Sequence, residues 1–542
     1  MKKLASIFLA LVMVLSLSVT AFAVEDTILT IDDSTGARTY NGYQLLTLTT
    51  SLKEGENHTA HTGDHTDDCY NYAYTVNEKY RAVLQRETFG NADDSVWGTA
   101  DKPVSADLVS NDQILDYLSK QTSDSGDTYG TLRTVADRIY RAIKNANIEA
   151  EKTGITDTAD IEKGYWMFAD VTALTGEDDA TSLVMVDTKG ADNITITPKV
   201  SIPTVEKKVK DIKDSEEDSI TDNPWQDSAD HDICDEVPFK LTAGAPSNAQ
   251  FYDKYTLVFH DTLSAGLTLN EESIEVYMYD TKHKADEDTD LNEGVDVTKY
   301  FTATTSGLGD GCTFEVGCDN VKEIPGMTLT SAFVVYYKAT LNENAVIGAA
   351  GNPNKVYLEF SNNPYGQGTG KTEEDKVIVF TYKLVVNKTD SHGHALKGAG
   401  FTLSKKNLDG TYTDIGTELK DDDMTTFEWK GLDDGDYKLV ESTVPAGYNK
   451  IGDILFSITA THSETADEPA LLTLDGGLMG TGVVEPGANS GVISNDIVNN
   501  TGTVLPETGG AGTVMLISCS SLFVVLAAVF MITRKKMSIY ED

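Results

Sequence analysis

The sequence predicts a mostly β, rod-like chain, in which tandem immunoglobulin-like β-sandwich domains follow a mixed α+β domain at the N-terminus. Short apolar or alternating segments, such as 257–261 and 333–337, predict strands. Turn pairs such as Asp409-Gly410 and Asp434-Gly435 recur at short intervals between them, as in an all-β sandwich. Apolar residues at helical spacing occur in the first part of the chain.

Length and charge limit what the chain can do. Its 542 residues are enough for three or four domains, and a hydrophobic content of 40% can supply their cores. The 86 acidic and 43 basic residues give a net charge of −43, which argues against nucleic acid as a partner. The sequence has no glycine-rich phosphate loop, HExxH motif or nucleophile elbow. We therefore expect a non-enzymatic protein without a cofactor.

The N-terminus has the three parts of a secretory signal peptide. Lys2 and Lys3 give a charged start, and an apolar stretch follows from Leu4 to about Val19. Ala21-Phe22-Ala23 supplies small residues for cleavage after Ala23. Residues 1–23 are therefore predicted to be removed on secretion.

The first domain is predicted at 24–199. Helical spacing predicts helices over 111–121 and 132–151, and apolar runs predict strands at 43–48, 164–171 and 192–197.

The second and third domains are predicted at 200–380 and 381–504, and each contains a lysine where an apolar residue is expected. In the strand 205–209, Lys207 shares a face with Val205 and Val209; in the strand 384–388, Lys388 shares a face with apolar neighbours. Burial disfavours the charged ammonium and lowers the lysine pKa. An uncharged lysine amine is a nucleophile.

The same alternation finds an acid and an asparagine after each lysine. Asp261 and Asn362 lie on apolar strand faces in the second domain, and Glu441 and Asn499 do so in the third. A buried carboxyl tends to stay protonated and can assist attack of the amine on the asparagine side chain. This order predicts two intramolecular isopeptide bonds, Lys207–Asn362 and Lys388–Asn499.

Two other interpretations remain at this point. The lysines could form buried salt bridges or extend to water at sheet edges. The register could also be wrong by one residue, which would substitute Lys208, Asn363 or Asn500.

The C-terminus has three parts in a fixed order. Leu505-Pro506-Glu507-Thr508-Gly509 precedes an apolar segment, 514–532, that is long enough to span a membrane as a helix. Arg534, Lys535 and Lys536 close the span on the cytoplasmic side. Residues 505–542 resemble the cell-wall sorting signal of Gram-positive surface proteins. The resemblance implies that a sortase cleaves between Thr508 and Gly509 and transfers the Thr508 carbonyl to an amine.

Two internal segments extend the resemblance. The segment 437–448, which contains Glu441, looks like the E-box of Cna B-type domains. The segments 260–263 and 358–364 are similar to the isopeptide-forming middle domain of sortase-assembled major (backbone) pilins. The resemblance implies a structural shaft subunit of a pilus, or fimbria, anchored to the cell wall. Its implied partners are pilus-specific and housekeeping sortases, identical subunits, peptidoglycan and minor pilins.

Backbone pilins join subunits through a lysine between the first two domains. Here the alternating run 194–199 ends in Pro198-Lys199 at that junction. Gly190 and Thr197 stand where the family motif has aromatic residues. The resemblance implies that Lys199 is exposed and is the inter-subunit lysine, in contrast to the two buried lysines.

Two other functions remain open. One is a singly anchored cell-wall adhesin or an accessory pilin. The other is a secreted metal-dependent enzyme that uses His58, His61, His65 and Cys69, although their segment has the composition of a loop. The sequence also leaves open a third isopeptide bond in the first domain and a local disulfide between Cys312 and Cys318.

Overall fold

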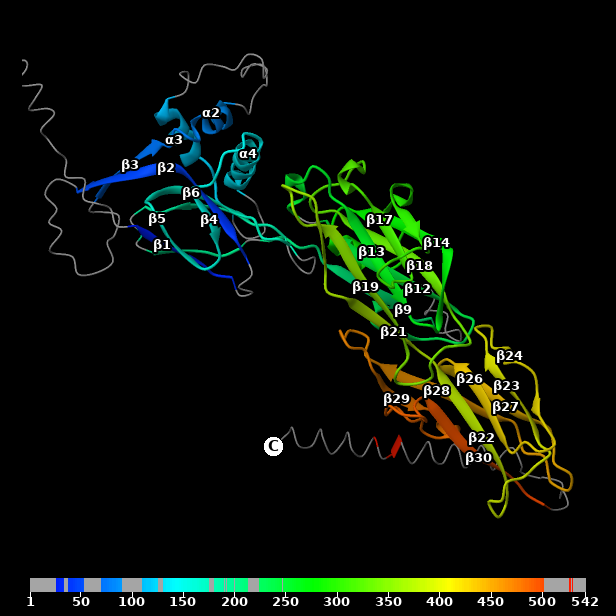
Figure 1. Cartoon of the computed structure of the whole chain (residues 1–542). Coiled ribbons are helices and arrows are strands. Elements are labelled where there is room, and N and C mark those ends of the chain that lie inside the picture. The colour runs from blue at the N-terminus through cyan, green and yellow to red at the C-terminus, as the bar shows by residue number, and fades with distance from the viewer. Residues whose placement is uncertain are drawn as a thin grey trace, which may run out of the picture.

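A computed structural model gives the fold of the chain. It describes residues 26–33, 38–52, 70–89, 110–124, 130–174, 180–189, 191, 193–198, 200–212, 224–245, 247–501, 526, 527 and 529. Three bodies follow one another from the blue N-terminal end, through the green middle domain, to the yellow and orange C-terminal domain (Figure 1). The predicted fold class, mostly β with a mixed α+β first domain, is confirmed.

The first domain packs helices against a sheet. Its strands form one sheet in the order β5-β1-β8 and a second in the order β3-β2-β6-β7, with β4 on β2. The strands are β1 (Thr27–Ile31), β2 (Tyr40–Leu52), β3 (Tyr70–Val76), β4 (Lys152–Ile155), β5 (Thr158–Ile161), β6 (Gly164–Asp170), β7 (Leu183–Asp187) and β8 (Asn193–Ile196). The helices are α2 (Arg81–Phe89), α3 (Asn111–Ser119) and α4 (Thr131–Asn145).

The helices differ from the sequence prediction at their ends. Ser110 caps α3 in a capping box with Gln113, which fixes its start. The helix predicted over 132–151 ends at Asn145, because Asn147 adopts a left-handed conformation with φ of 51°. Helix α2 was not predicted; its apolar residues Val83 and Leu84 join the core beneath α4.

The middle domain is a sandwich of two sheets around one large apolar core. A six-stranded sheet has the order β10-β9-β12-β18-β14-β15, and a seven-stranded sheet has the order β11-β21-β19-β13-β17-β16 with β20 on β19. The strands are β9 (Val205–Lys210), β10 (Trp225–Gln226), β11 (Ser228–Asp230), β12 (Glu236–Gly244), β13 (Leu257–Leu263), β14 (Leu267–Tyr279), β15 (Val295–Asp296), β16 (Thr302–Thr304), β17 (Phe314–Cys318), β18 (Ala332–Leu341), β19 (Asn352–Ser361), β20 (Thr369–Lys371) and β21 (Asp375–Phe380). Its helical segments are α5 (Lys282–Glu287) and the 3-10 turns Ala249–Phe251, Thr298–Tyr300 and Val321–Glu323.

The C-terminal domain is a smaller sandwich with its own core. One sheet has the order β26-β22-β30, with β22 and β30 parallel, and the other has the order β24-β23-β27-β28-β29 with β25 on β23. The strands are β22 (Tyr382–Asp390), β23 (Gly400–Lys406), β24 (Tyr412–Asp414), β25 (Leu419–Lys420), β26 (Thr426–Leu432), β27 (Gly435–Thr443), β28 (Ile454–His462), β29 (Leu471–Asp475) and β30 (Val492–Asn499). A 3-10 turn occupies Gly477–Met479.

The first and middle domains meet between α4 and the loop after β19. The ring of Tyr365 packs edge-on against Tyr140 with centroids 4.7 Å apart. Lys144 Nζ donates to the Tyr365 carbonyl over 2.8 Å, and Arg141 donates to the Pro364 carbonyl over 3.2 Å. The contact therefore combines the ring of Tyr365 with hydrogen bonds from the cations of α4 to backbone carbonyls of the loop.

The middle and C-terminal domains approach closely through glycines. The backbones at Gly348 and Gly491 lie so near that a Cβ on either would overlap the other segment. Gly431, at φ of 72°, lies against Ile233, and its carbonyl accepts the Ile233 N–H over 3.0 Å. Glycine is required here both by conformation and by space.

The membrane span predicted at 514–532 lies outside the described residues except at 526, 527 and 529. Within the described part of the chain, no helix is long and apolar enough to cross a membrane.

We expect Gly431→Ala to destabilise the contact between the middle and C-terminal domains. Gly410→Ala is the matched control, since Gly410 has φ of 80° but no atom within 4 Å of an added Cβ. Both variants incur the backbone cost of a left-handed alanine, and only Gly431→Ala adds overlap with Ile233, which we expect to cost about 1–3 kcal/mol more. Thermal melting should show the lower midpoint for Gly431→Ala; equal midpoints would contradict the importance of this contact.

Candidate functional site

The core of the middle domain contains a lysine that pairs with an aspartate. Lys207 on β9 and Asp261 on β13 come from opposite sheets, and both side chains are 0% exposed. Lys207 Nζ contacts Asp261 Oδ2, and it lies 3.0 Å from the hydroxyl of Tyr337 on β18. The predicted inward face of both residues is therefore the one that the structure shows.

Burial shifts the two pKa values toward each other. It lowers the pKa of Lys207 to about 8, although the charge of Asp261 acts in the opposite direction. It also raises the pKa of Asp261 above its ordinary value, against the effect of Lys207. Both shifts favour an uncharged amine beside a protonated carboxyl, which is the state that nucleophilic attack requires.

Tyr337 links this pair to an asparagine that the sequence analysis did not consider. The Tyr337 hydroxyl donates to Asp261 Oδ2 over 3.0 Å, and Asn354 Nδ2 donates to the Tyr337 oxygen over 2.6 Å. Asn354 is fully buried on β19, and its Oδ1 has no hydrogen-bond partner. The cluster therefore consists of Lys207, Asp261, Tyr337 and Asn354.

Asn362, the predicted partner of Lys207, lies elsewhere. Register pairs Asp261 with Val356, and six residues along the chain, at about 3.3 Å each, place Asn362 about 20 Å away. Its carbonyl accepts the Thr181 N–H over 3.0 Å, at the contact with the first domain. Asn362 follows the end of β19 at Ser361, and alternation could not give its distance from Lys207.

Three asparagines near β19 face inward, and their contacts separate them. Asn352 is held by backbone groups: its Oδ1 accepts from Val346 N over 2.8 Å, and its Nδ2 donates to the Val346 and Val379 carbonyls. Asn362 lies beyond reach of the cluster. Asn354 alone of the three adjoins Lys207 and Asp261. In the sequence, the alternation Asn352-Pro353-Asn354 continues the inward face of β19 upstream of the run 356–362.

The C-terminal domain brings the other three predicted residues together. Lys388 on β22, Glu441 on β27 and Asn499 on β30 are each 0% exposed. Asn499 Nδ2 donates to Glu441 Oε1 over 2.8 Å, while Glu441 Oε2 accepts the Ile451 N–H over 3.0 Å. Asn499 Oδ1 has no hydrogen-bond partner.

Lys388 is held by main-chain oxygens. Its Nζ donates to the Thr389 carbonyl over 2.9 Å and to the Ile497 carbonyl over 2.8 Å. Burial lowers the pKa of Lys388 to about 8, despite the opposing charge of Glu441. The parallel pairing of β22 with β30 sets Lys388 opposite Ile497, two residues before Asn499 on the same face.

The one-residue alternatives point away from these clusters. Lys208 forms ion pairs with Asp227 over 2.6 Å and Glu206 over 3.0 Å. Asn363 Oδ1 accepts the Tyr365 N–H over 2.9 Å in the loop, and Asn500 is exposed. A further buried lysine, Lys240, makes no hydrogen bond to a side-chain carboxylate or side-chain amide among the described residues; its Nζ donates to the backbone carbonyl of Ala285 over 3.1 Å.

Several predicted residues lie outside the described part of the chain. These are Lys199, the cleavage pair Thr508 and Gly509, and the cluster of His58, His61, His65 and Cys69. In the described residues of the first domain, no lysine is buried, so none is placed for a third internal bond there.

Cys312 and Cys318 are both free thiols. Cys318 is buried in the core at the end of β17, on the same side as Phe314 and Val316. Cys312 lies on the outer side, near His260. A local disulfide is therefore not formed, because the sheet separates the two sulfur atoms.

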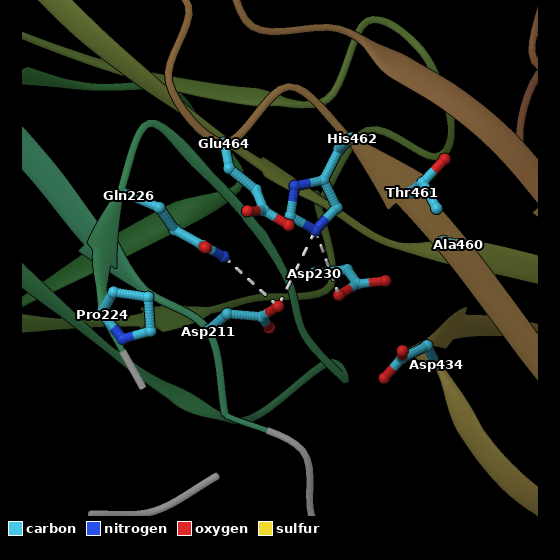
Figure 2. Close-up of a pocket in the computed structure, with 9 residues that line it drawn as sticks. All are labelled: Asp211, Pro224, Gln226, Asp230, Asp434, Ala460, Thr461, His462 and Glu464. Carbon is cyan, nitrogen blue, oxygen red and sulfur yellow. Dashed lines mark hydrogen bonds and ion pairs between the residues drawn. The ribbon is translucent and has the colours of Figure 1, made fainter. Parts of the chain in front are cut away.

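A polar cluster joins the middle and C-terminal domains. His462, at the end of β28, points toward Asp211 and Asp230 beside a cavity of about 250 Å³ (Figure 2). Its Nε2 lies 3.7 Å from a carboxylate oxygen of each aspartate. Its Nδ1 lies 2.8 Å from the Ser228 hydroxyl, which itself donates to the Ser463 carbonyl over 2.8 Å.

These contacts determine the protonation of His462. The one hydroxyl proton of Ser228 goes to the Ser463 carbonyl, so Ser228 must accept a proton from Nδ1. Nε2 faces two carboxylates and also needs its proton. Burial alone acts to lower the pKa of His462, but Asp211 and Asp230 outweigh it and raise the pKa to about 10.

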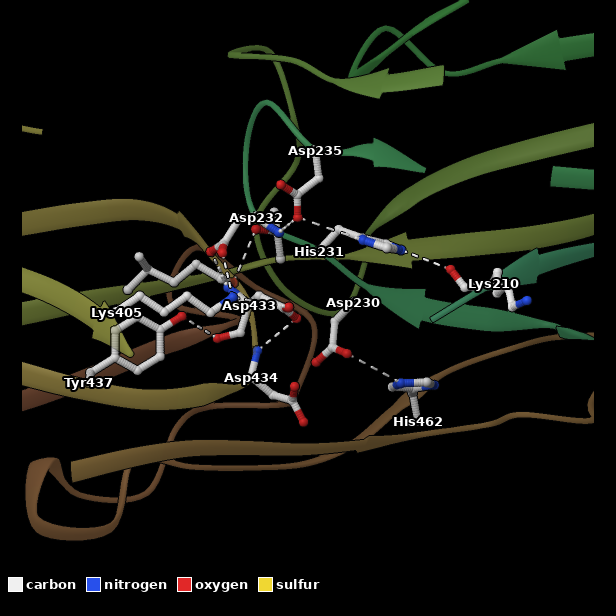
Figure 3. Close-up of polar contacts among 12 residues, drawn as sticks. Lys210, Asp230, His231, Asp232, Asp235, Lys405, Asp433, Asp434, Tyr437 and His462 are labelled. Atoms are coloured by element: carbon white, nitrogen blue, oxygen red, sulfur yellow. Dashed lines mark hydrogen bonds and ion pairs between the residues drawn. The ribbon is translucent and has the colours of Figure 1, made fainter. Parts of the chain in front are cut away.

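A second charged group crosses the same junction. Lys405 Nζ on β23 contacts Asp232 of the middle domain and lies 3.3 Å from Asp433 Oδ2 (Figure 3). The Asp433 N–H donates to Asp232 Oδ1 over 2.8 Å. Burial, with a contribution from Asp230, raises the pKa of Asp433 well above its ordinary value. The junction thus pairs charges across the two domains away from water.

We expect His462→Gln to lower the melting midpoint in a pH-dependent way. Because the folded-state pKa exceeds the ordinary value of 6.5, the contribution of His462 is fully present below pH 6.5 and is lost as pH rises through about 10. We expect the substitution to lower the free energy of unfolding by more than about 1 kcal/mol below pH 6.5, and each kcal/mol lowers the melting midpoint by roughly 2–4 °C. Melting curves of both proteins between pH 6 and 10.5 test this, with His283→Gln on α5 as an exposed control. A pH-independent difference would contradict a charged His462.

Comparisons with known proteins agree with the resemblance in the C-terminal domain. Residues 382–468 match the family described as SpaA, prealbumin-like fold domain. This segment includes Lys388 and Glu441. The chain is also 29% identical over 234 residues to the trypsin-resistant surface T6 protein of Streptococcus pyogenes serotype M6. That match covers 39% of this chain and 39% of the T6 protein.

Solved structures with similar folds include three pilins. The T6 backbone pilin of Streptococcus pyogenes gives a TM-score of 0.46 at 17% identity, covering 88% of this chain and 99% of that chain. The major pilin SpaD of Corynebacterium diphtheriae gives 0.40 at 14% identity, covering 88% and 98%. The major pilin RrgB of Streptococcus pneumoniae gives 0.37 at 12% identity, covering 65% and 85%. Residues 382–468 therefore carry a SpaA prealbumin-like fold domain, and a 234-residue segment of the chain is similar to the T6 protein.

Proposed function

We propose that this chain is the shaft subunit of a covalently polymerised pilus that is anchored to the cell wall of a Gram-positive bacterium. The observation that carries the proposal is the pair of fully buried lysine, carboxyl and asparagine clusters, one in each sandwich domain. Burying these groups has a desolvation cost that packing alone does not require. Formation of an amide bond removes both the charge and the cost.

In the middle domain the bond would form between Lys207 and Asn354. The uncharged Lys207 Nζ would attack Cγ of Asn354. After a half-turn of the Asn354 amide and a reversal of the two Tyr337 hydrogen bonds, a protonated Asp261 would donate to the Tyr337 oxygen, and the Tyr337 hydroxyl would donate to Asn354 Oδ1. The new C–N bond forms, the bond from Cγ to Nδ2 breaks, and Nδ2 leaves as ammonia with a proton taken from the attacking amine. Folding holds the reactants together, which can lower the barrier by about 7–11 kcal/mol.

In the C-terminal domain Lys388 would attack Asn499, and Glu441 would assist. A half-turn of the Asn499 amide brings its oxygen beside Glu441 Oε1, where a protonated carboxyl donates to it. Lys388 Nζ already donates to the carbonyl of Ile497, which lies two residues before Asn499 on β30. Each reaction occurs once per molecule, so the chain modifies itself and is not an enzyme.

The positions of the two bonds suit a protein under tension. Lys388 and Asn499 lie on the first and last strands of the C-terminal domain, β22 and β30. Lys207 lies on the first strand of the middle domain, and Asn354 lies near its end. In the C-terminal domain, a force that enters at β22 would pass through the amide bond to β30 and would bypass the hydrogen-bonded ladder between strands. In the middle domain, β20 and β21 follow Asn354, so the bond would shield the part of the domain from β9 to β19.

Polymerisation would use Thr508, at the C-terminal end of the mature chain, and Lys199, at the junction of the first two domains. A pilus-specific sortase would cleave after Thr508 and transfer its carbonyl to Lys199 of the neighbouring subunit, and a housekeeping sortase would attach the polymer to peptidoglycan. The precursor would be held briefly in the membrane by residues 514–532. Minor pilins would be further partners.

Intact-mass spectrometry of the purified secreted chain should show the loss of two ammonia molecules. We expect Lys388→Ala, Asn499→Ala, Lys207→Ala and Asn354→Ala each to lose only one, because each removes a reactant from one cluster. Lys240→Ala is the matched control for a buried lysine outside the clusters and should still lose two.

Asn362→Ala separates the two assignments in the middle domain. It should also lose two ammonia molecules, since Asn362 lies about 20 Å from the cluster along the strand. If Asn362→Ala lost only one ammonia molecule and Asn354→Ala lost two, the bond in the middle domain would instead join Lys207 to Asn362. An unmodified wild-type mass would refute the internal chemistry.

Immunoblots of cell-wall extracts test the polymer separately. The wild-type chain should give a ladder of high-molecular-weight species, and Lys199→Ala should abolish it while the two ammonia losses remain. Lys189 also precedes the junction of the first two domains, so Lys189→Ala is the control and should keep the ladder. A single band in the wild type would instead favour a singly anchored adhesin or an accessory pilin, and a ladder that persists in Lys199→Ala would assign another lysine.

A further inference from the structure

A cluster of histidine, cysteine and carboxylates lies on the outer face of the middle domain. His260 on β13 faces away from the core, because its neighbours Phe259 and Asp261 face inward. Register places it between Glu315 of β17 and Tyr357 of β19. Asp310 and Cys312, just before β17, complete the cluster.

The four ligand-bearing side chains converge on one point. His260 Nδ1 lies 2.8 Å from Asp310 Oδ2, 3.4 Å from Glu315 Oε1 and 3.9 Å from Cys312 Sγ. Cys312 Sγ lies 4.0 Å from Glu315 Oε1. A tetrahedral zinc ion with bonds of about 2.0–2.3 Å separates its ligand atoms by roughly 3.3–3.8 Å. The His260–Glu315, His260–Cys312 and Cys312–Glu315 separations of 3.4, 3.9 and 4.0 Å are close to this range. The His260–Asp310 pair is closer, at 2.8 Å, and all four ligand atoms lie within 4.8 Å of one another.

The donor set selects the type of metal. One imidazole nitrogen, one thiolate sulfur and two carboxylate oxygens match the mixed ligands of zinc. Calcium and magnesium take oxygen ligands almost alone, and a sulfur ligand argues against them. From this geometry we propose that His260, Asp310, Cys312 and Glu315 bind one zinc ion. On binding, the Cys312 thiol would release its proton to solvent, and His260 would keep the proton on Nε2.

The residues around the cluster hold the ligands as a metal site requires. The Tyr357 hydroxyl donates to Asp310 Oδ2, and the Cys312 N–H donates to Asp310 Oδ1 over 3.1 Å. The Tyr357 ring stacks on His260 with centroids 4.4 Å apart. Such outer contacts orient the first ligands of a metal.

The second nitrogen of His260 gives an independent indication. His260 is 7% exposed, yet its Nε2 has no hydrogen-bond partner, and the nearest carboxylate oxygen, Oε2 of Glu359, is 3.8 Å away. A histidine that binds metal through one nitrogen commonly directs its other N–H to a carboxylate. Metal binding through Nδ1 would fix the proton on Nε2, directed at Glu359. Lys371 Nζ donates to the Tyr357 hydroxyl over 3.3 Å.

The site would pin the segment that carries Asp310 and Cys312 onto the outer face of the sheet. The Thr313 N–H that follows donates to the Asp261 carbonyl over 2.6 Å, so this segment lies directly behind the carboxyl of the inner cluster. The zinc site is on the opposite face of β13 from Lys207 and does not depend on the proposed pilus function.

Cobalt is the direct probe of this site. The purified secreted chain, reduced and stripped of metal with a chelator, should bind one Co²⁺ and show tetrahedral d–d absorption with a thiolate-to-cobalt charge-transfer band. One equivalent of Zn²⁺ should remove both. Cys312→Ser should abolish the charge-transfer band, whereas Cys234→Ser and Cys69→Ser should leave it unchanged. Absence of the band in the wild type, or its loss in Cys69→Ser, would overturn the proposal.

A measurement on the wild-type chain avoids any folding defect of a variant. Zn²⁺ should slow alkylation of Cys312, mapped by peptide mass spectrometry, and leave the exposed Cys234 unaffected. Tyr357→Phe, which removes the hydrogen bond to Asp310, should weaken zinc affinity by about 10–100-fold. Protection of Cys69 in place of Cys312 would move the metal to the segment that contains His58 and refute the site.

Discussion

The burial of two lysine amines beside a carboxyl and an amide is the interaction on which the sandwich domains depend. An ammonium group loses several kcal/mol when it leaves water, and a paired carboxylate recovers only part of this. Lys207 and Lys388 are both fully buried, and burial lowers the pKa of each to about 8. Each domain therefore folds around a lysine whose charged form is disfavoured by burial.

The two clusters reach this state by different means. In the middle domain, Tyr337 stands between Lys207, Asp261 and Asn354, so the hydroxyl connects residues from both sheets. In the C-terminal domain, Glu441 contacts Asn499 directly, and main-chain carbonyls hold Lys388. The shared feature is an asparagine amide whose oxygen has no hydrogen-bond partner.

The domain junctions are polar where the domain interiors are apolar. His462 and Lys405 of the C-terminal domain face aspartates of the middle domain across the junction. Removal of one member would leave a buried charge unpaired, which is costly. Directional charge pairs and close glycine contacts fix the relative orientation of the two sandwiches better than an apolar contact of the same size, since they have few equivalent arrangements.

The sequence by itself determined the fold class and the inward faces of Lys207, Lys388, Asp261, Glu441 and Asn499. Strand alternation carries this information, because a side chain at every second position must face the same side. Only the tertiary structure decided which asparagine adjoins Lys207, since Asn352, Asn354 and Asn362 share one face and the register with β13 separates them. The tertiary structure alone also revealed that Tyr337 joins the Lys207 cluster and that the His260 cluster forms, because each cluster assembles from strands and loops far apart in the chain. Local periodicity reports the face of a strand, whereas position along it and contact across the sandwich are set by long-range pairing.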